Sequence, residues 1–324
     1  MMTRAQRSNP LTLKSMQPSR NQKFQLPILQ SHEVKLILKR EDQLHPLISG
    51  NKFRKLKYNL EAARLKKAHT LLTFGGAYSN HILATAAAAA EHGFKSTGII
   101  RGEELKNRID ENPTLSKAQA LGMKFIFVDR ERYRVLTRDE KKARELCAQD
   151  GIFMIPEGGS NALAVRGVSE MLVEEDLEAD YICCAVGTGA TLAGIAEAAA
   201  SHQKVLGYAA LDHDSLHQEV ARFTKKTNYT IISDYTFGGY AKISPRLVEQ
   251  MNSWLKRTEV LFDPVYTAKM MFGILDGVKR GAIPKGSVIL AIHTGGLQGI
   301  EGMNSRLEKK NAPLIQISCN KKAS

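Results

Sequence analysis

Short apolar runs alternate along this chain with stretches whose apolar positions recur at helical spacing. Residues 53–68 and 79–93 follow the helical pattern, and Gly93 suits the left-handed turn that ends a helix. Wholly apolar strands set between helices are typical of a parallel sheet that helices cover on both faces. We therefore predict an α/β fold with strands at residues 34–41, 70–76, 96–102, 124–129, 153–159, 181–187, 205–211 and 288–296.

Glycines stand at the ends of several of these strands. Open α/β sheets bind ligands outside the carboxyl ends of their strands, where glycines let the backbone turn tightly. The pattern predicts a cleft built from several loops, at Gly75-Gly76, Gly158-Gly159, Gly187 to Gly189 and Gly295-Gly296.

The composition excludes some classes of function. The chain has 324 residues, 43% of them hydrophobic and 24% charged, and no apolar run approaches the roughly 20 residues that span a bilayer. Its net charge of +13 is spread through the predicted helices without a basic stripe interleaved with aromatics, so we expect a solvated surface and no nucleic-acid partner. Residues 1–23 carry five basic residues and no acid, which predicts a flexible tail, with a transit peptide as the alternative.

The cysteines and a pair of histidines give no metal site. His213 and His217 have i, i+4 spacing, but no third ligand is evident, so we expect a solvated helix start. The absence of metal or disulfide spacing favours a reducing compartment, and we expect a cytoplasmic protein with two adjacent cysteines as small core residues. The cysteines are Cys147, Cys183, Cys184 and Cys319.

The segment VGTGATLAG (186–194) joins a buried strand to an alanine-rich helix through glycines. Backbone N–H groups and the positive end of the helix then face one point, which favours a phosphate group. The segment half-matches a dinucleotide fingerprint, with Gly187, Gly189 and the later Asp212 in place and Leu192 instead of the third glycine. An NAD-dependent Rossmann dehydrogenase is therefore one candidate function.

Lys52 follows the Gly50-Asn51 turn and stands at the start of a predicted helix. The positive end of a helix disfavours the ammonium form of a lysine, which leaves a free amine for a Schiff base. Taken alone, a solvated lysine is the commoner reading, because Lys55 and Lys57 lie on the same helix.

Six segments together carry more information than any one of them. They are GNKFRKLKY (50–58), GGAYSNH (75–81), EGGSN (157–161), GTGATLAG (187–194), DPVYTAK (263–269) and HTGG (293–296). From about Lys39 to Gly296 the chain resembles the pyridoxal phosphate (PLP) enzymes of the 1-aminocyclopropane-1-carboxylate (ACC) deaminase and D-cysteine desulfhydrase family, in which these motifs follow in this order. The resemblance implies a tryptophan synthase β-like fold of type II, with two domains of open, twisted, mostly parallel sheets and PLP in the cleft between them.

The resemblance implies roles for single residues. Lys52 would bind PLP covalently and act in catalysis. Ser79 and Asn80 would contact the substrate carboxylate and the ring hydroxyl of the cofactor, and Ser79 would also act in catalysis. His81 would lie beside them at the substrate. Two catalytic tyrosines would lie over the substrate, Tyr266 in DPVY and Tyr240 in FGGY. The other cofactor-binding residues implied are Gly187, Thr188, Gly189, Ala190, Thr191, Thr267 and Thr294.

Departures from the family's motifs bear on the substrate. ACC deaminases carry a glutamate after the DPVY tyrosine, facing the pyridine nitrogen, whereas this chain has Thr267, as D-cysteine desulfhydrases do. A carboxylate keeps that nitrogen protonated and makes the ring a strong electron sink, and a hydroxyl does not. His81 also follows the desulfhydrase pattern. The segment 297–299, Leu-Gln-Gly, stands where both enzymes usually have Ala-Pro-Ala, so the native substrate stays open.

We expect β-elimination from D-cysteine or another small amino acid, giving a 2-oxo acid and ammonia. Lys52 would be the base that takes the α-proton, and Tyr266 or Tyr240 the acid that assists the leaving group. ACC deamination is the alternative within the family, and the Rossmann dehydrogenase is the alternative from another class.

The resemblance also predicts a discontinuous organisation. Residues 1–50 and 165–324 would form a large PLP-binding domain, and residues 51–164 a small domain. A homodimer is expected from the family alone, with a small amino acid as the substrate and no membrane partner.

Overall fold

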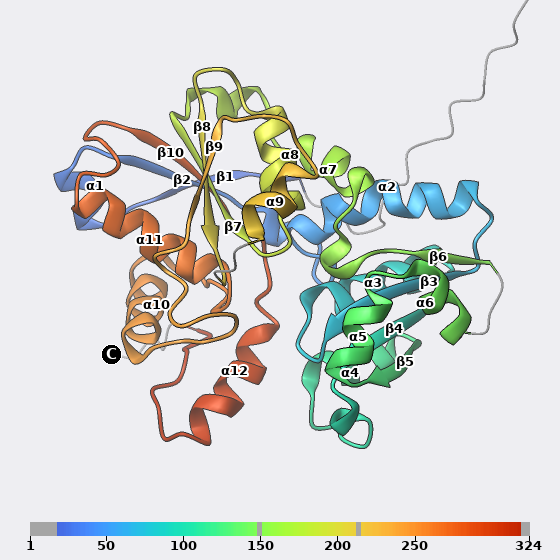
Figure 1. Ribbon diagram of the computed structural model, residues 1–324. Coiled ribbons are helices and arrows are strands. Elements are labelled where there is room, and N and C mark those ends of the chain that lie inside the picture. Colours follow the sequence, from blue (N-terminus) through green and yellow to red (C-terminus); the bar gives the residue numbers. More distant parts are fainter. Residues whose placement is uncertain (1–17, 148–150, 212–214, 319–324) are drawn as a thin grey trace, which may run out of the picture.

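The computed structural model describes residues 18–147, 151–211 and 215–318, whose strands divide between two sheets (Figure 1). The larger sheet has the order β1-β2-β10-β7-β8-β9, and only β1 runs antiparallel to its neighbour. Its strands are β1 (Asn21–Phe24), β2 (Lys35–Lys39), β7 (Tyr181–Val186), β8 (Lys204–Ala209), β9 (Tyr229–Ile232) and β10 (Val288–Ile292). The smaller sheet, fully parallel, has the order β5-β4-β3-β6, with β3 (Thr70–Gly76), β4 (Lys95–Arg101), β5 (Met123–Val128) and β6 (Ile152–Met154).

Helices cover both faces of the larger sheet, as the apolar strands require. One face packs against α1 (Pro27–Ser31), α10 (Pro245–Thr258), α11 (Thr267–Lys279) and α12 (Gly299–Glu308). The other packs against α7 (Ala162–Ser169), α8 (Ala190–Ala198) and α9 (Leu216–Ala221). Cys183 and Cys184 are both fully buried and belong to opposite cores, as neighbours on a strand should.

The smaller sheet is covered in the same way. The helices α2 (Asn51–Leu65), α3 (Asn80–His92) and α4 (Pro113–Ala120) lie on one face, and α5 (Arg130–Leu136) and α6 (Glu140–Cys147) on the other. Gly93 ends α3 in the left-handed conformation, with φ of 73°.

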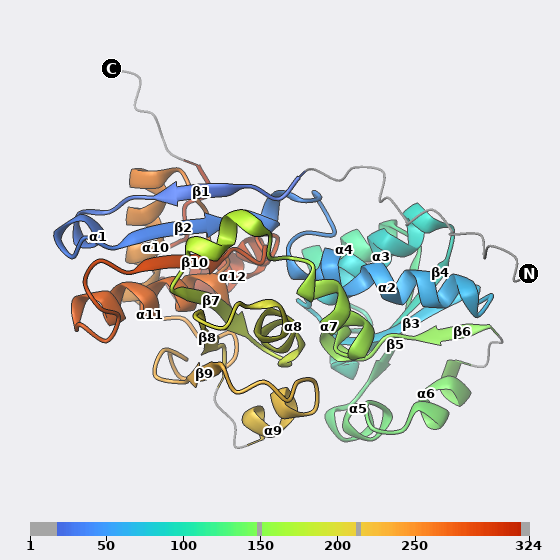
Figure 2. The same ribbon diagram turned by 90° about the horizontal axis from the view of Figure 1, so that it is seen from above.

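The two sheets are joined through α2 and α7, which pack together between them (Figure 2). The contact is close because a Cβ built on Gly167 would lie 2.0 Å from the carbonyl oxygen of Arg54. The helix α7 then packs on α8, so the start of α2 and the start of α8 are held near each other. The predicted domain boundaries at 50 and 165 fall beside this junction and stay a prediction.

One expectation about the N-terminus is wrong. Residues 21–23 were predicted to lie in a flexible tail, but they belong to β1, which pairs with β2 from Asn21 opposite Lys39 to Phe24 opposite Leu36. Phe24 is only 2% exposed and packs edge-on against Phe262, so the burial of one aromatic ring fixes the strand. Among the helices of the described residues, none has the length and apolar character needed to cross a membrane.

Candidate active site

A cavity lies where the glycine-rich ends of strands from both sheets meet. Asn51, Lys52 and Lys55 come from the first turns of α2, and Asn80 opens α3. The loops after β7 and β10 supply most of the opposite wall. The lining residues are Asn51, Lys52, Lys55, Asn80, Gly158, Ala185, Val186, Gly187, Thr188, Gly189, Thr191, Leu192, Tyr266, Thr294 and Gly295.

Lys52 is brought to the cavity by a turn that only glycine can make. Gly50 has φ of 63°, and a Cβ there would lie 1.8 Å from the carbonyl oxygen of Thr294. Desolvation lowers the pKa of Lys52 to about 8, and the nearby Asp263 carboxylate offsets only part of that shift. No acceptor for the Lys52 ammonium is found among the described residues, so no hydrogen bond stabilises the charged form, and the lowered pKa makes the neutral amine easier to reach than that of an ordinary lysine.

The opposite wall is a cradle of backbone N–H groups. Gly187, Thr188 and Gly189 follow β7, and α8 begins at Ala190, whose N–H donates to the carbonyl of Thr188 at 3.1 Å. The next N–H groups of the first turn have no acceptor within the helix, and the helix begins at the cavity wall, so they can serve an anionic ligand there. Asn51 donates from Nδ2 to Thr191 Oγ1 at 2.8 Å, which ties the start of α2 to the start of α8. Of the five loop residues assigned to the cofactor, all but the fully buried Ala190 line the cavity.

Lys55 is a cavity residue that the sequence analysis left as a solvated charge. It is 2% exposed, and its Nζ donates to the carbonyl of Gly158 at 3.1 Å and to Ser160 Oγ at 3.2 Å. Burial and the neighbouring Lys52 charge lower its pKa well below the ordinary value, so an anion in the cavity would be stabilising. Its position three residues after Lys52, on the same face of α2, is the signal that could have revealed it.

The segment Ser79-Asn80-His81 reaches the cavity only at its middle residue. Ser79 caps α3, its Oγ accepting from the N–H of Ile82 at 3.4 Å, and Asn80 lines the cavity. His81 was expected beside the substrate, but it does not line the cavity. It is 1% exposed, with Nε2 2.8 Å from Thr73 Oγ1, and burial lowers its pKa well below the ordinary value. A neutral, buried His81 therefore supports the cavity wall from behind.

The two predicted tyrosines meet at the cavity. Tyr266 lines it, and its hydroxyl donates to the hydroxyl of Tyr240 at 3.2 Å, with the rings edge to face. Tyr240 stands farther out and is 44% exposed. Burial raises the pKa of both phenols, for Tyr266 well above its ordinary value, so both keep their protons at neutral pH.

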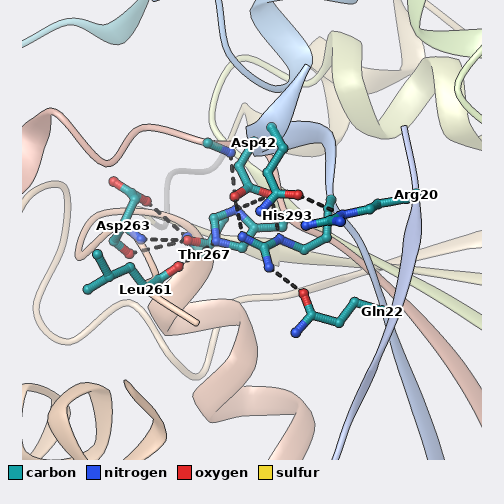
Figure 3. A network of polar contacts seen from close by, with 10 residues as sticks. Arg20, Gln22, Asp42, Leu261, Asp263, Thr267 and His293 are labelled. Carbon is teal, nitrogen blue, oxygen red and sulfur yellow. Dashed lines mark hydrogen bonds and ion pairs between the residues drawn. The ribbon is translucent and has the colours of Figure 1, made fainter. Parts of the chain in front are cut away.

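Thr267, expected to face the pyridine nitrogen, does not line the cavity. It is fully buried, and its Oγ1 accepts from the N–H of Asp263 at 2.8 Å (Figure 3). The Asp263 carboxylate in turn accepts from the N–H groups of Tyr266 at 2.6 Å and Thr267 at 3.0 Å. Burial raises the pKa of Asp263 to about 6. These reciprocal bonds cap α11 and fix the backbone that carries Tyr266, while Thr294 supplies the threonine that does line the cavity.

A buried polar network fixes the loop that carries Thr294. His293 stacks on Phe262 and donates from Nε2 to the carbonyl of Leu261 at 2.6 Å (Figure 3). Its Nδ1 accepts from the N–H of Gly295 at 3.3 Å and lies 3.7 Å from Asp42. Burial lowers the pKa of His293, so the ring is neutral and can donate from Nε2 while it accepts at Nδ1.

The residues present fit PLP. An available lysine amine suits the aldehyde, and the N–H cradle with Lys55 suits the phosphate. A Cβ on Gly158 would lie 2.8 Å from Thr188 Oγ1, so glycine keeps the cradle open. Lys52, Asn80, the cradle, Tyr266 and Thr294 are thus brought together, whereas Ser79, Tyr240, His81, Ala190 and Thr267 stand behind or beside them.

The comparisons with known proteins agree with this chemistry. The family model described as pyridoxal-phosphate dependent enzyme matches residues 18–295. A Thermotoga maritima protein, named provisionally as an ACC deaminase, is 33% identical over 84% of this chain and 92% of its own length. The bifunctional D-cysteine desulfhydrase/ACC deaminase of Arabidopsis thaliana mitochondria is 30% identical over 82% of this chain and 73% of its own length. A crystal structure of an ACC deaminase homologue covers 93% of this chain and 95% of its own, with a TM-score of 0.76 at 27% identity.

The dehydrogenase alternative fails on this match. Asp212, on which that alternative depends, lies outside the described residues, as does His213 of the histidine pair. Among the described residues, no group of three side chains is suited to hold a metal ion. The glycine loop instead faces a lysine, an asparagine and a tyrosine in one cavity. The chain therefore belongs to the family of pyridoxal-phosphate dependent enzymes.

Proposed function

We propose that this enzyme eliminates the β-substituent of a small amino acid, with D-cysteine as the model substrate, and releases a 2-oxo acid and ammonia. One observation carries the choice of reaction. No aspartate or glutamate is among the cavity-lining residues of the described chain. The lining therefore supplies no carboxylate that would hold a pyridine nitrogen protonated, which would favour a substrate with an α-hydrogen over a cyclopropane that has none.

When bound, PLP withdraws electrons from the α-carbon of the substrate. Lys52 would hold PLP and, once displaced by the substrate, take the α-proton on Nζ, for which a pKa lowered to about 8 is well matched. The Tyr266 and Tyr240 hydroxyls, kept protonated by burial, would supply a proton to the leaving sulfur. Ser79 and Asn80 at the start of α3 would hold the substrate carboxylate. Gly187 to Gly189, Thr191 and Lys55 would hold the phosphate.

The test is a comparison of two products on the purified protein supplied with PLP. We expect sulfide and pyruvate from D-cysteine at a kcat/KM at least tenfold above that for 2-oxobutanoate from ACC. Ready turnover of ACC without turnover of D-cysteine would assign the alternative, which the names of several relatives favour.

We also propose that the enzyme is a cytoplasmic homodimer, on the strength of the family resemblance and the lack of disulfide spacing. The discontinuous large and small domains, divided near residues 50 and 165, belong to the same proposal. Light scattering on the purified protein tests the dimer, and limited proteolysis tests the domain division, with cleavage expected near residues 50 and 165.

A further inference from the structure

The loop that departs from the family's motifs makes a hydrogen bond to a residue that lines the cavity. Gln298 stands at the start of α12, on the larger sheet's side, and donates from Nε2 to Asn80 Oδ1 at 2.6 Å. Asn80 opens α3 on the smaller sheet's side and lines the cavity. Both side chains are partly buried, so the bond is shielded from water.

This bond decides which end of the Asn80 amide is free. An asparagine amide carries one acceptor oxygen and one donor NH₂ group, and Gln298 occupies the oxygen. The NH₂ group lies against Gly296, where a Cβ would come within 2.5 Å of Nδ2. With Oδ1 held by Gln298, the NH₂ group is the end of the Asn80 amide left for a ligand in the cavity, which Asn80 lines together with Thr294 and Gly295.

We propose that Gln298 is a positioning residue that holds the Asn80 amide with its NH₂ group toward the oxygen substituent of the cofactor ring. The proposal rests on the proposed function only in that PLP must bind the cavity. An oxygen that is anionic accepts a hydrogen bond from NH₂ and is repelled by a carbonyl oxygen, so the orientation of one amide changes the affinity for the cofactor. Gln298 would thus affect cofactor binding through Asn80, without being among the residues that line the cavity.

The same region offers a matched control. Glu301, one turn along α12, pairs with Lys117 of α4 at 3.1 Å, also between the two sheets. The two side chains are 60% and 51% exposed and are not among the residues that line the cavity, so the pair tests the contact between the two halves without touching the amide.

Two variants separate orientation from simple tethering. Gln298→Met removes the donor and keeps the length of the side chain. Gln298→Glu can only accept, so it would pair with Asn80 Nδ2 and turn Oδ1 toward the cavity. We expect the dissociation constant for PLP to rise about tenfold or more in Gln298→Glu and by less in Gln298→Met, with a shifted pH midpoint of cofactor absorbance in both. Glu301→Gln should stay within about twofold of wild type.

The outcomes are distinguishable. If Gln298→Glu binds PLP as wild type does, or better than Gln298→Met, the bond is a tether and the proposal is overturned. Thermal unfolding of each apo-protein shows whether a weak binder is folded, and Gln298→Met supplies the result if Gln298→Glu does not fold. If the wild-type protein bound no PLP, the proposed function itself would be contradicted, before any variant is compared.

Discussion

Two lysines share the same lowered pKa but differ in their surroundings: Lys52 is partly buried and Lys269 is fully buried. Lys52, in the cavity at the start of α2, and Lys269, on the first turn of α11, both have a pKa lowered to about 8 by desolvation. Lys52 has no hydrogen-bond acceptor within the described parts of the chain. Lys269 is 0% exposed and donates to three carbonyl oxygens, those of Ala210 at 3.0 Å, Thr236 at 2.7 Å and Gly239 at 2.8 Å.

The difference shows how an enzyme keeps one amine reactive and another inert. The three carbonyls hold Lys269 in place and anchor the loop of residues 236–240 to α11, which fixes Tyr240 beside Tyr266. Lys52 bears the cost of burial without that compensation, so its neutral form is available to a ligand. The lowered pKa alone does not identify the reactive lysine. The lack of hydrogen-bond acceptors around the amine does.

The largest effect should follow from Lys52→Ala. Removing the amine that holds PLP and takes the α-proton should lower kcat by about 10³-fold or more. The absorbance of lysine-bound PLP and its bleaching by borohydride should also disappear, because no other cavity lysine is as free. A variant that is still yellow and borohydride-sensitive would make Lys55 or Lys269 the anchor and break the comparison.

Lys269→Met should cost stability where Lys52→Ala costs activity. Three buried carbonyls would lose their donor, and an unsatisfied buried group costs about 1–3 kcal/mol, so we expect a loss of about 3 kcal/mol in the free energy of unfolding by urea. The exposed Lys285, paired with Glu33, gives a control in Lys285→Met. Equal stability of Lys269→Met and wild type would mean that the three bonds are not formed in solution.

The apo-protein should reveal the cost of burying Lys52 through pH. Below pH 8 the lysine is charged in both states, so the folded state carries the full cost of burial. Between pH 8 and its ordinary pKa of about 10.5 the unfolded chain binds more protons, so folding stability rises with pH. Lys52→Met should therefore be more stable than wild-type apo-protein by about 1–2 kcal/mol at pH 7, below the ceiling of about 3 kcal/mol from the pKa shift.

Urea unfolding of both proteins at pH 7 and pH 10 measures this gap, and taking the difference cancels the titration of Lys269. The gap should shrink as the pH rises. A gap that is constant between pH 7 and pH 10 would show that Lys52 is solvated in the apo-protein.

The smallest effect on stability is expected at Lys35, which has hydrogen-bond acceptors but is exposed to solvent. Lys35 donates to both carboxylate oxygens of Glu178, at 2.9 and 2.8 Å, but the two side chains are 42% and 49% exposed. We expect Lys35→Met to change the free energy of unfolding by less than about 0.5 kcal/mol. A loss as large as that of Lys269→Met would mean that acceptors matter more than burial.

Periodicity in the sequence predicts the regular elements well. The run TLLTFGG matches β3 from Thr70 to Gly76, and the helix predicted at 79–93 is α3, Asn80–His92. The strands β1 and β9 were missed because each is four residues long and only partly apolar, and each gains its place by pairing with a neighbour already in the sheet.

The candidate site shows where sequence reasoning stops. Motif order indicates which loops meet, and the structure brings Lys52, Asn80, Tyr266 and the glycine cradle together. Motif order does not tell which side chain of a motif faces the cavity. His81 and Thr267 stand next to cavity residues in the sequence, but their own side chains are buried in the core. Lys55 and Gln298 depend on partners more than 100 residues away, and spacing along one helix or strand carries no trace of those contacts.

The order of strands in the larger sheet has a consequence for synthesis of the chain. The strand β2 has β10 as its parallel neighbour, with Lys35 opposite Val288, about 250 residues later. The smaller sheet needs only residues 70–154. Pairings between distant segments form slowly and late, and domains fold as they emerge from the ribosome. We expect the smaller sheet to form first, and the turn of Gly50 and Lys52 to gain its contact with Thr294 only after β10 has been made. A chain that stops before β10 would lack the wall of the cavity that Thr294 and Gly295 supply.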